Sequence, residues 1–169
     1  DYTTQLSASA WIYPTAYPSG ASDLFSILSN DRNYEFHLTP SGKLYWLWEA
    51  STLTSATTIL LNQWTHVAIT FDTAGLLTIY VNGAKDVTLQ TKGGSVPVDY
   101  LQMVCSGATY FRNHCMMAQV RFWKKCISAS QIESNRYYSI APTDDMVGYW
   151  RMDEGSGDIC SDCTSNGRH

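Results

Sequence analysis

The chain has 169 residues and a formal net charge of −4, and 44% of its residues are hydrophobic and 13% aromatic. This composition is too apolar for an intrinsically disordered protein, and the length suits one domain with its own core. Acidic residues outnumber basic ones, 15 to 11, which argues against a nucleic-acid partner because such binding needs a concentrated basic face. No apolar run approaches the roughly 20 residues of a membrane-spanning helix, so no membrane insertion is expected.

Alternation of apolar and polar residues predicts short strands along most of the chain. The stretch 6–13 places apolar residues at every second position, and 34–38 and 44–48 do so on either side of a Thr-Pro-Ser-Gly turn. A short strand is expected at 57–61. The Ser/Thr-rich stretch 51–58 is expected to be mainly a solvated loop, with O-linked sugars as an alternative use.

The clearest predicted hairpin joins 64–72 to 76–81. Asn82-Gly83 then predicts a tight turn into a strand at 85–90, because both turn positions tolerate positive φ. Further strands are expected at 100–105, 115–123 and 146–152.

One helix is expected, near 128–138. Ser128 and Gln131 have the spacing of a capping box, Ile132 supplies a buried contact, and Pro142 closes the segment. Because helices do not alternate with the strands, a parallel α/β fold is excluded. The chain is therefore predicted to be all-β, a two-sheet antiparallel jelly-roll sandwich with one short helix near 128–138.

The five cysteines favour disulfides in an oxidising compartment over zinc binding or redox chemistry, because only one pair is closely spaced and no histidine lies at a zinc-site offset. Cys105 and Cys115 flank a short connection and are expected to pair, while Cys126 is expected to reach Cys160 or Cys163. Sequence leaves the connectivity open. The odd number leaves one thiol free or bonded outside the chain.

Three segments together resemble laminin-G-like, concanavalin A-like jelly rolls, a group that includes pentraxins. The segments are 9–14 (S-A-W-I-Y-P), 64–83 (W-T-H-V-A-I-T-F-D to L-T-I-Y-V-N-G) and 118–128 (A-Q-V-R-F-W to I-S). They occur in the family's order and together cover nearly the whole chain. The resemblance implies the two-sheet fold.

A fourth segment, 147–157, resembles the opening strand of that family, which in most members precedes the part that here is 9–14. We therefore expect residues 1–145 to form the jelly roll. Residues 146–169, a C-terminal strand with a cysteine-containing loop, either close the same sheet or open a neighbouring module in a tandem or polymeric array. In either case the strand must be covered, since an unpaired apolar edge promotes aggregation.

The fold family includes glucanases, but the pattern of acids does not suit glycoside hydrolysis. That reaction needs two carboxyl groups held close together, whereas Asp153 and Glu154 are adjacent and so point to opposite sides of a strand. No enzymatic activity is expected. For glycan binding, the candidate stacking residues are Trp46 and Trp48, or Tyr110 and Phe111. The alternative for the two tryptophans is burial in the core.

Calcium is the cofactor that the resemblance suggests, because family members hold it through Asp and Asn oxygens. Asp162 and Asn166 match the loop that does so, and Asn30 and Asp31 form a second oxygen-rich loop. The alternative for both loops is a turn in which these side chains bond their own backbone.

These observations predict a secreted or surface-displayed, non-catalytic adhesion or structural module, one unit of a multidomain or polymeric protein. Its partners would be neighbouring modules or copies of the same protein. A calcium-assisted lectin that binds glycans is the alternative, and an accessory domain of a glycan-processing enzyme is a third interpretation.

Overall fold

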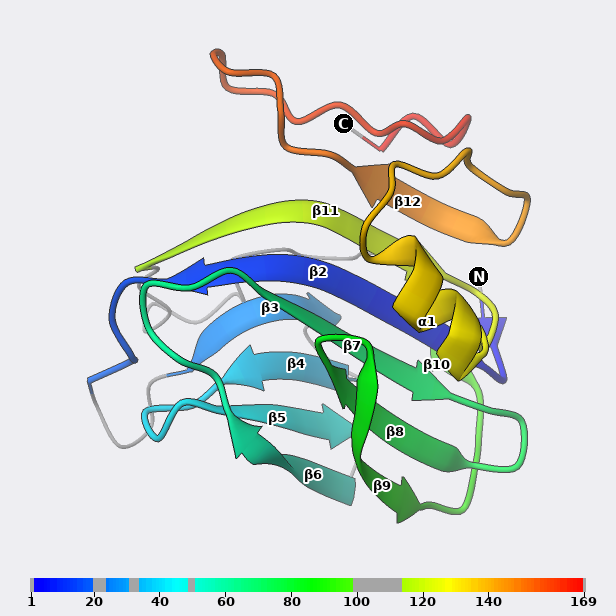
Figure 1. Cartoon of the computed structure of the whole chain (residues 1–169). Coiled ribbons are helices and arrows are strands. Elements are labelled where there is room, and N and C mark those ends of the chain that lie inside the picture. The colour runs from blue at the N-terminus through cyan, green and yellow to red at the C-terminus, as the bar shows by residue number, and fades with distance from the viewer. Residues whose placement is uncertain (1, 20–23, 31–33, 49–50, 99–113, 169) are drawn as a thin grey trace.

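The computed structural model describes residues 2–19, 24–30, 34–48, 51–98 and 114–168. These parts form two antiparallel sheets packed face to face, with a two-stranded ribbon and one helix outside them (Figure 1). The all-β sandwich expected from the alternation is confirmed. No helix in this part of the chain is long and apolar enough to cross a membrane.

The larger sheet has six strands in the order β12-β11-β2-β7-β8-β9. Their bounds are β2 (Leu6–Pro14), β7 (Thr65–Phe71), β8 (Leu76–Val81), β9 (Ala84–Gln90), β11 (Cys115–Trp123) and β12 (Met146–Trp150). The predicted hairpin of β7 and β8 is present, and Asn82 and Gly83 make the turn into β9 with φ values of 50° and 82°. A tight turn of this kind requires positive φ at both positions.

The smaller sheet has four strands in the order β3-β4-β5-β6. They are β3 (Phe25–Asn30), β4 (Tyr34–Leu38), β5 (Lys43–Trp48) and β6 (Ser51–Thr58), and β1 (Tyr2–Thr3) pairs with β10 (Val96–Pro97) as a separate ribbon. Two expectations are corrected here. A strand lies at 25–30 where none was predicted, and the stretch 51–58 is the edge strand β6 rather than a loop followed by a strand at 57–61.

Polar residues form β6 because its pairing with β5 satisfies the backbone, and an edge strand needs few apolar side chains. The hydroxyl of Ser55 also accepts the Leu44 amide at 2.9 Å. On the other side, the Asp86 carboxylate of β9 accepts the amides of Ala56 and Thr57 at 2.7 and 3.1 Å. Asp86 therefore joins the edges of the two sheets.

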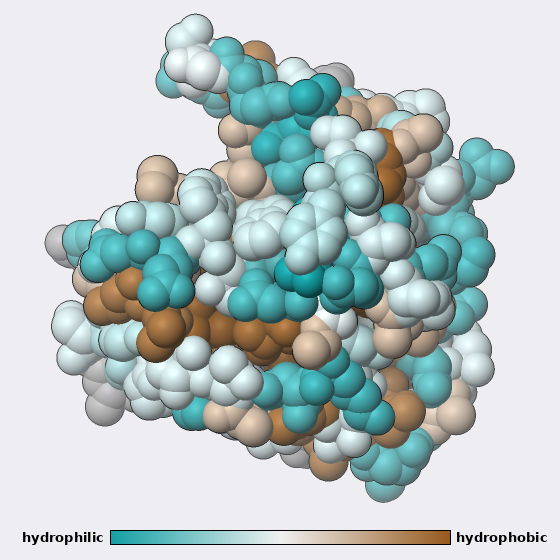
Figure 2. All heavy atoms as spheres, viewed as in Figure 1, coloured by the Kyte–Doolittle hydropathy of each residue, from teal (hydrophilic) through white to brown (hydrophobic). Residues whose placement is uncertain are grey.

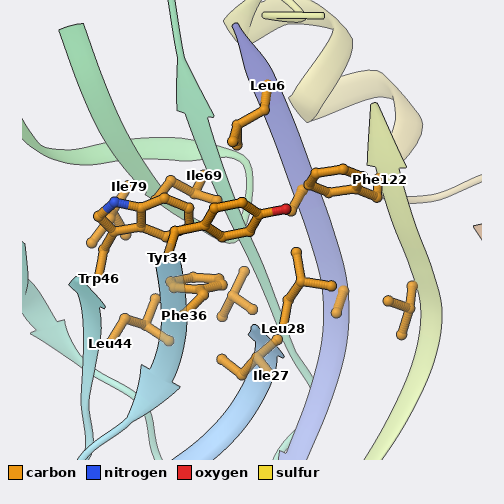
Figure 3. Packing of buried hydrophobic residues seen from close by; sticks show 14 of the residues in the cluster. Leu6, Ile27, Leu28, Tyr34, Phe36, Leu44, Trp46, Ile69, Ile79 and Phe122 are labelled. Atoms are coloured by element: carbon orange, nitrogen blue, oxygen red, sulfur yellow. The ribbon is translucent and has the colours of Figure 1, made fainter. Parts of the chain in front are cut away.

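The core lies between the inner faces of the two sheets and is rich in aromatic rings (Figure 3). Tyr34 stacks on Trp46 with ring centroids 5.3 Å apart, and Phe122 lies on the other side of Tyr34 at 6.3 Å. Trp48 meets Phe71 edge to face at 4.7 Å. Such pairs add to the stabilisation that burial of the rings supplies.

Helix α1 (Ala129–Asn135) lies on the outer face of the six-stranded sheet (Figure 1). The predicted capping box is present: the Gln131 amide donates to the Ser128 hydroxyl, and the Gln131 side chain accepts the Ser128 amide. Ile132 is buried in a second apolar cluster with Ala68 and Trp123. The helix is thereby fixed against the side of the sheet that faces away from the core.

The C-terminal strand docks on its own chain, because β12 pairs antiparallel with β11. In this chain the strand therefore extends the six-stranded sheet, while the division at residue 145 and the role of the segment in a neighbouring module stay predictions. The tail then turns back along the outer edge of β12, where Trp150 and Asp162 form a bridge and the Cys163 amide donates to the Tyr149 carbonyl at 2.7 Å. This return covers part of an edge that would otherwise be open to pairing with another strand.

Candidate binding site on the outer face of the sheet

Two aromatic residues of β2 face away from the core. Leu6, Ala8, Ala10 and Ile12 belong to the core cluster, so the alternating positions Trp11 and Tyr13 lie on the outer face and are half-buried. Trp64, just before β7, joins them: its side chain is 44% exposed and its ring centroid lies 5.6 Å from that of Tyr13. We call Trp11, Tyr13 and Trp64 the aromatic surface.

The register of the neighbouring strands defines the surroundings of this surface. Tyr13 is opposite Met116 of β11, which is 51% exposed, and Trp11 is opposite both Ala118 of β11 and His66 of β7. Figure 2 shows an elongated hydrophobic band on the face of the molecule that carries α1; its colour scale makes Trp and Tyr pale, so the band itself is not the aromatic surface. Exposed apolar area gathered in one place commonly marks a binding surface.

The residue behind Trp11 is a neutral histidine. His66 is only 2% exposed, and its ring meets Trp11 edge to face at 5.5 Å. Burial, reinforced by the positive charges of Arg121 and Arg136, lowers the pKa of His66 to about 3. His66, which contacts the Trp11 ring, therefore stays uncharged at neutral and mildly acidic pH.

The indole of Trp11 is held at its edge by the end of α1. Its Nε1 donates to the Arg136 carbonyl at 2.8 Å. This bond satisfies the polar atom of a half-buried ring and fixes the orientation of its face. The surface thus combines one anchored ring with the more exposed ring of Trp64.

The sequence-predicted stacking residues lie elsewhere. Trp46 and Trp48 are 1% and 5% exposed, so neither presents the ring face that stacking on a sugar requires, and the core alternative describes them. The reason is their place on the inner face of β5, where they fill the space between the sheets. Tyr110 and Phe111 lie outside the described residues. The sequence analysis did not predict Tyr13 and Trp64 as binding residues. The alternation in 6–14 could have indicated Tyr13, because it places Tyr13 on the face of the strand opposite to the apolar residues.

The Asp162 loop does not fit a calcium site. Asp162 is 7% exposed, and each of its carboxylate oxygens accepts two protein hydrogen bonds: Oδ1 those of the Tyr149 and Thr164 amides (3.1 and 2.9 Å), Oδ2 those of the Thr164 hydroxyl and the Arg168 amide (2.7 and 3.1 Å). These donors take the roughly four acceptor positions of a carboxylate. A cation would have to displace them.

Asn166 supports the same interpretation, because its Nδ2 donates to the carbonyls of Met146 and Val147 at 3.0 and 3.1 Å. In the second candidate loop, Asn30 is 5% exposed and Asp31 lies outside the described residues. Within the described ranges, no group of three or more His, Cys, Asp or Glu side chains is placed to hold a metal ion. The turn alternative therefore describes the loop at 162–166.

The cysteines that the structure describes, Cys115, Cys126, Cys160 and Cys163, are all free thiols. The expected bond from Cys126 to Cys160 or Cys163 is not formed. Cys126 lies beside Gln5 near the start of β2, whereas Cys163 lies against the outer edge of β12, two strands further across the sheet. The expected partner of Cys115, Cys105, falls outside the described residues.

A family model described as the concanavalin A-like lectin/glucanases superfamily matches residues 1–133. The chain belongs to this superfamily. The structures similar to it include a Bacteroides ovatus protein assigned provisionally to carbohydrate binding, with a TM-score of 0.82 and 19% identity over 98% of this chain and 51% of that one. A comparison with curated proteins finds no match.

Two further structures have the same fold at greater distance. The binding domain of Paraclostridial Mosquitocidal Protein 1 has a TM-score of 0.61 and 16% identity over 81% of this chain and 38% of that chain. The native heptameric SAP-like pentraxin of Limulus polyphemus has a TM-score of 0.53 and 18% identity over 78% and 69%. At these identities the likeness concerns the fold. The chain spans about half the length of the Bacteroides ovatus protein.

Proposed function

We propose that this chain is a non-catalytic carbohydrate-binding module that acts outside the cell, and that the aromatic surface binds the glycan. The observation that carries the proposal is the pairing of Tyr13 and Trp64, two ring systems 5.6 Å apart and accessible on the outer face of the sheet. Membership of a lectin and glucanase superfamily, and structural likeness to a protein assigned provisionally to carbohydrate binding, favour a glycan over other ligands.

The chemistry of the surface suits a sugar. The C–H face of a pyranose is apolar while its rim carries hydroxyls, and Trp and Tyr pair a large apolar face with a polar atom. Rings held in place before binding lose little side-chain entropy when the ligand arrives. Trp11 is held in this way by its bond to Arg136 and by its contact with His66.

The arrangement of charge beside the surface suits binding better than hydrolysis. Glu133, on α1, is engaged with Arg136 at 2.7 Å. Retaining and inverting hydrolases instead place two carboxyl groups across the scissile bond. The absence of a metal requirement is part of the proposal, because the Asp162 carboxylate already has its protein donors.

Such a module would attach the protein that contains it to glycans at a cell surface or in a matrix. The adhesive role, assembly with neighbouring modules, and polymer formation stay predictions from the sequence. Glycan binding is the role that the outer face of the sheet supports.

The test is glycan binding by the wild type and three single variants. Soluble oligosaccharides are titrated by calorimetry and insoluble polysaccharides are used in pull-down assays. Trp64→Ala and Tyr13→Ala are each expected to weaken binding about tenfold, equivalent to about 1.4 kcal/mol. Tyr2→Ala removes an aromatic ring that is 75% exposed on β1 and serves as the matched control. The proposal fails if no glycan binds, or if the two surface variants bind like the wild type while fully folded.

A further inference from the structure

Arg121 is a fully buried cation on the outer face of the six-stranded sheet. Its side chain is 1% exposed, and the register of β11 places it between Ser9 of β2 and Tyr149 of β12. Its guanidinium lies 4.8 Å from the centre of the Tyr149 ring and donates to Oε1 of Gln119 at 2.7 Å. Burying a guanidinium is costly unless its donors find acceptors, so the remaining partners of Arg121 are informative.

Those partners are backbone carbonyls at the end of α1. Arg121 donates from Nη1 to the Asn135 carbonyl and from Nη2 to the Tyr138 carbonyl, both at 2.7 Å. Trp11 donates to the carbonyl of Arg136 between them. The last carbonyls of a helix have no partner within the helix, and they attract positive charge. Side chains of the sheet thus hold the last turn of α1 and the residues that follow it in one place.

The segment held in this way carries two exposed aromatic rings. Tyr137 is 61% exposed and Tyr138 is 69% exposed. The Arg136 guanidinium lies 4.1 Å from the centre of the Tyr137 ring, and Arg136 is itself fixed by its ion pair with Glu133 at 2.7 Å. One face of Tyr137 is therefore covered by a cation, which holds the ring in place, while most of the side chain remains accessible.

Tyr137 is also next to the aromatic surface. The residue before it is bonded to the Trp11 indole, and Trp11 and Tyr13 are two positions apart on β2, which corresponds to about 7 Å along the strand. Trp64 contacts Tyr13, Trp11 lies two positions before Tyr13 on β2, and Tyr137 follows the residue whose carbonyl is bonded to Trp11. Figure 1 shows α1 in front of the six-stranded sheet, in the region of β2 and β7.

We infer that Tyr137 is a second contact site that extends the aromatic surface, so that the surface binds consecutive sugars of a linear polysaccharide rather than a single terminal sugar. Arg121 is the positioning residue for this extension, since it holds the turn that carries Tyr137. The inference rests on the proposed function, and it adds a ligand class and two residues to it. An open row of rings on a sheet face suits an extended chain, whereas a terminal sugar is better enclosed by a pocket.

The experiment measures how affinity depends on ligand length. Linear cello-, xylo- and malto-oligosaccharides, each from the disaccharide to the hexasaccharide, are titrated against the wild type by calorimetry. In the series that binds, wild-type affinity is expected to rise with length. Tyr137→Ala should remove most of that rise, weakening hexasaccharide binding about five- to tenfold and leaving disaccharide binding unchanged. Tyr2→Ala should behave like the wild type.

Arg121→Lys tests the positioning role, because lysine keeps the charge but not the planar fork that bonds two carbonyls at once. It is expected to reduce the gain with length in the same way as Tyr137→Ala. If this variant does not fold, Tyr137→Ala alone decides the inference.

The outcomes separate the two proposals. Wild-type affinity that is independent of length, or a Tyr137→Ala protein with the full wild-type gain, overturns the extended site while Trp64→Ala can still show that glycan binding is correct. Absence of binding to every member of the three series, and to insoluble polysaccharide, overturns the proposed function itself.

Discussion

Asp162 accepts the backbone amide of Tyr149 at 3.1 Å, and through this bond the tail is fastened to the last strand of the sheet. The same carboxylate holds the amides of Thr164 and Arg168, so one side chain organises the return of the chain along β12. The resemblance of this loop to the family's calcium-binding loop led to the prediction that Asp162 binds a cation. Here protein donors occupy the positions that a cation would need.

The first prediction concerns calcium. Removing divalent ions with a chelator is expected to leave both the melting temperature and glycan affinity unchanged, because the Asp162 loop is complete without metal. Asp162→Ala is expected to destabilise the fold by about 2–4 kcal/mol, since several hydrogen bonds to a buried carboxylate are lost together. Asp158→Asn, in the same tail, is the control. A melting temperature that falls on chelation and recovers with calcium would show that the loop binds metal after all.

The second prediction concerns pH. Burial, then the charges of Arg121 and Arg136, lower the pKa of His66 to about 3 from an ordinary value of 6.5. Below pH 6.5 the unfolded chain therefore takes up a proton that the folded chain does not, and stability falls. The free energy of unfolding is expected to drop by about 3 kcal/mol from this residue between pH 6.5 and 4.

The measurement is chemical denaturation at a series of pH values. His66→Gln should lose the dependence on pH between 6.5 and 4, whereas the exposed His114→Gln should keep it. As the pH falls below 4.5, the ordinary pKa of glutamate, a further loss is expected from Glu35, because its hydrogen bond with His37 lowers its pKa in the folded protein. An unchanged profile in His66→Gln would contradict the assignment.

The third prediction separates core tryptophans from surface ones. Trp46→Ala is expected to cost about 3–5 kcal/mol, because it removes a fully buried ring that stacks on Tyr34. Trp64→Ala should cost less than about 1 kcal/mol, since that ring is partly in solvent. The folded variant Trp46→Phe should keep wild-type glycan affinity. Loss of affinity in Trp46→Phe together with full affinity in Trp64→Ala would reverse the two roles.

The fourth prediction concerns Gly83, in the turn that abuts α1. An added Cβ would lie 1.9 Å from Oε2 of Glu133, and φ is +82°, so Gly83→Ala strains the turn and requires the Glu133 side chain, which pairs with Arg136 through Oε1, to move. Gly157→Ala has a φ of +97° but open space around it, and it controls for strain alone. Both changes should cost about 1 kcal/mol in backbone strain.

Gly83→Ala is expected to cost about 0.5 kcal/mol more than this control in chemical denaturation, because it also disturbs the exposed Glu133–Arg136 ion pair. It should also weaken the gain of affinity with glycan length, since Arg136 holds the Tyr137 ring. Equal losses in the two alanine variants would show that the contact with α1 is unimportant.

Much of the fold could be predicted because local signals agreed with the final packing. The hairpin of β7 and β8 follows from strict alternation, its exit from Asn82-Gly83, and the start of α1 from the Ser128 capping box. The strands that were missed lack such signals. All residues of β3 are buried, so it shows no alternation, and β6 is a polar edge strand whose stability comes from pairing rather than from apolar side chains.

The candidate site was harder to predict because aromatic residues occupy both faces of the sheets. Alternation sets Trp11 and Tyr13 apart from the apolar residues of 6–12, but it does not show that Trp64, which precedes a different strand, lies beside Tyr13. The connection from Arg121 to the end of α1 depends on residues distant in sequence. It also depends on the irregularity of β11 at Gln119, where φ is 53° and the register with β2 shifts. Neither feature has a pattern in the sequence.

At each border of the six-stranded sheet, an aspartate carboxylate accepts backbone amides beside the edge strand. At one border the C-terminal segment that contains Asp162 lies along β12. At the other border the Asp86 carboxylate of β9 accepts a backbone amide of β6. A strand of another copy that extended the six-stranded sheet would have to displace one of these contacts first. The Asp162 and Asp86 carboxylates therefore help to keep these two strand edges from pairing with another copy of the chain.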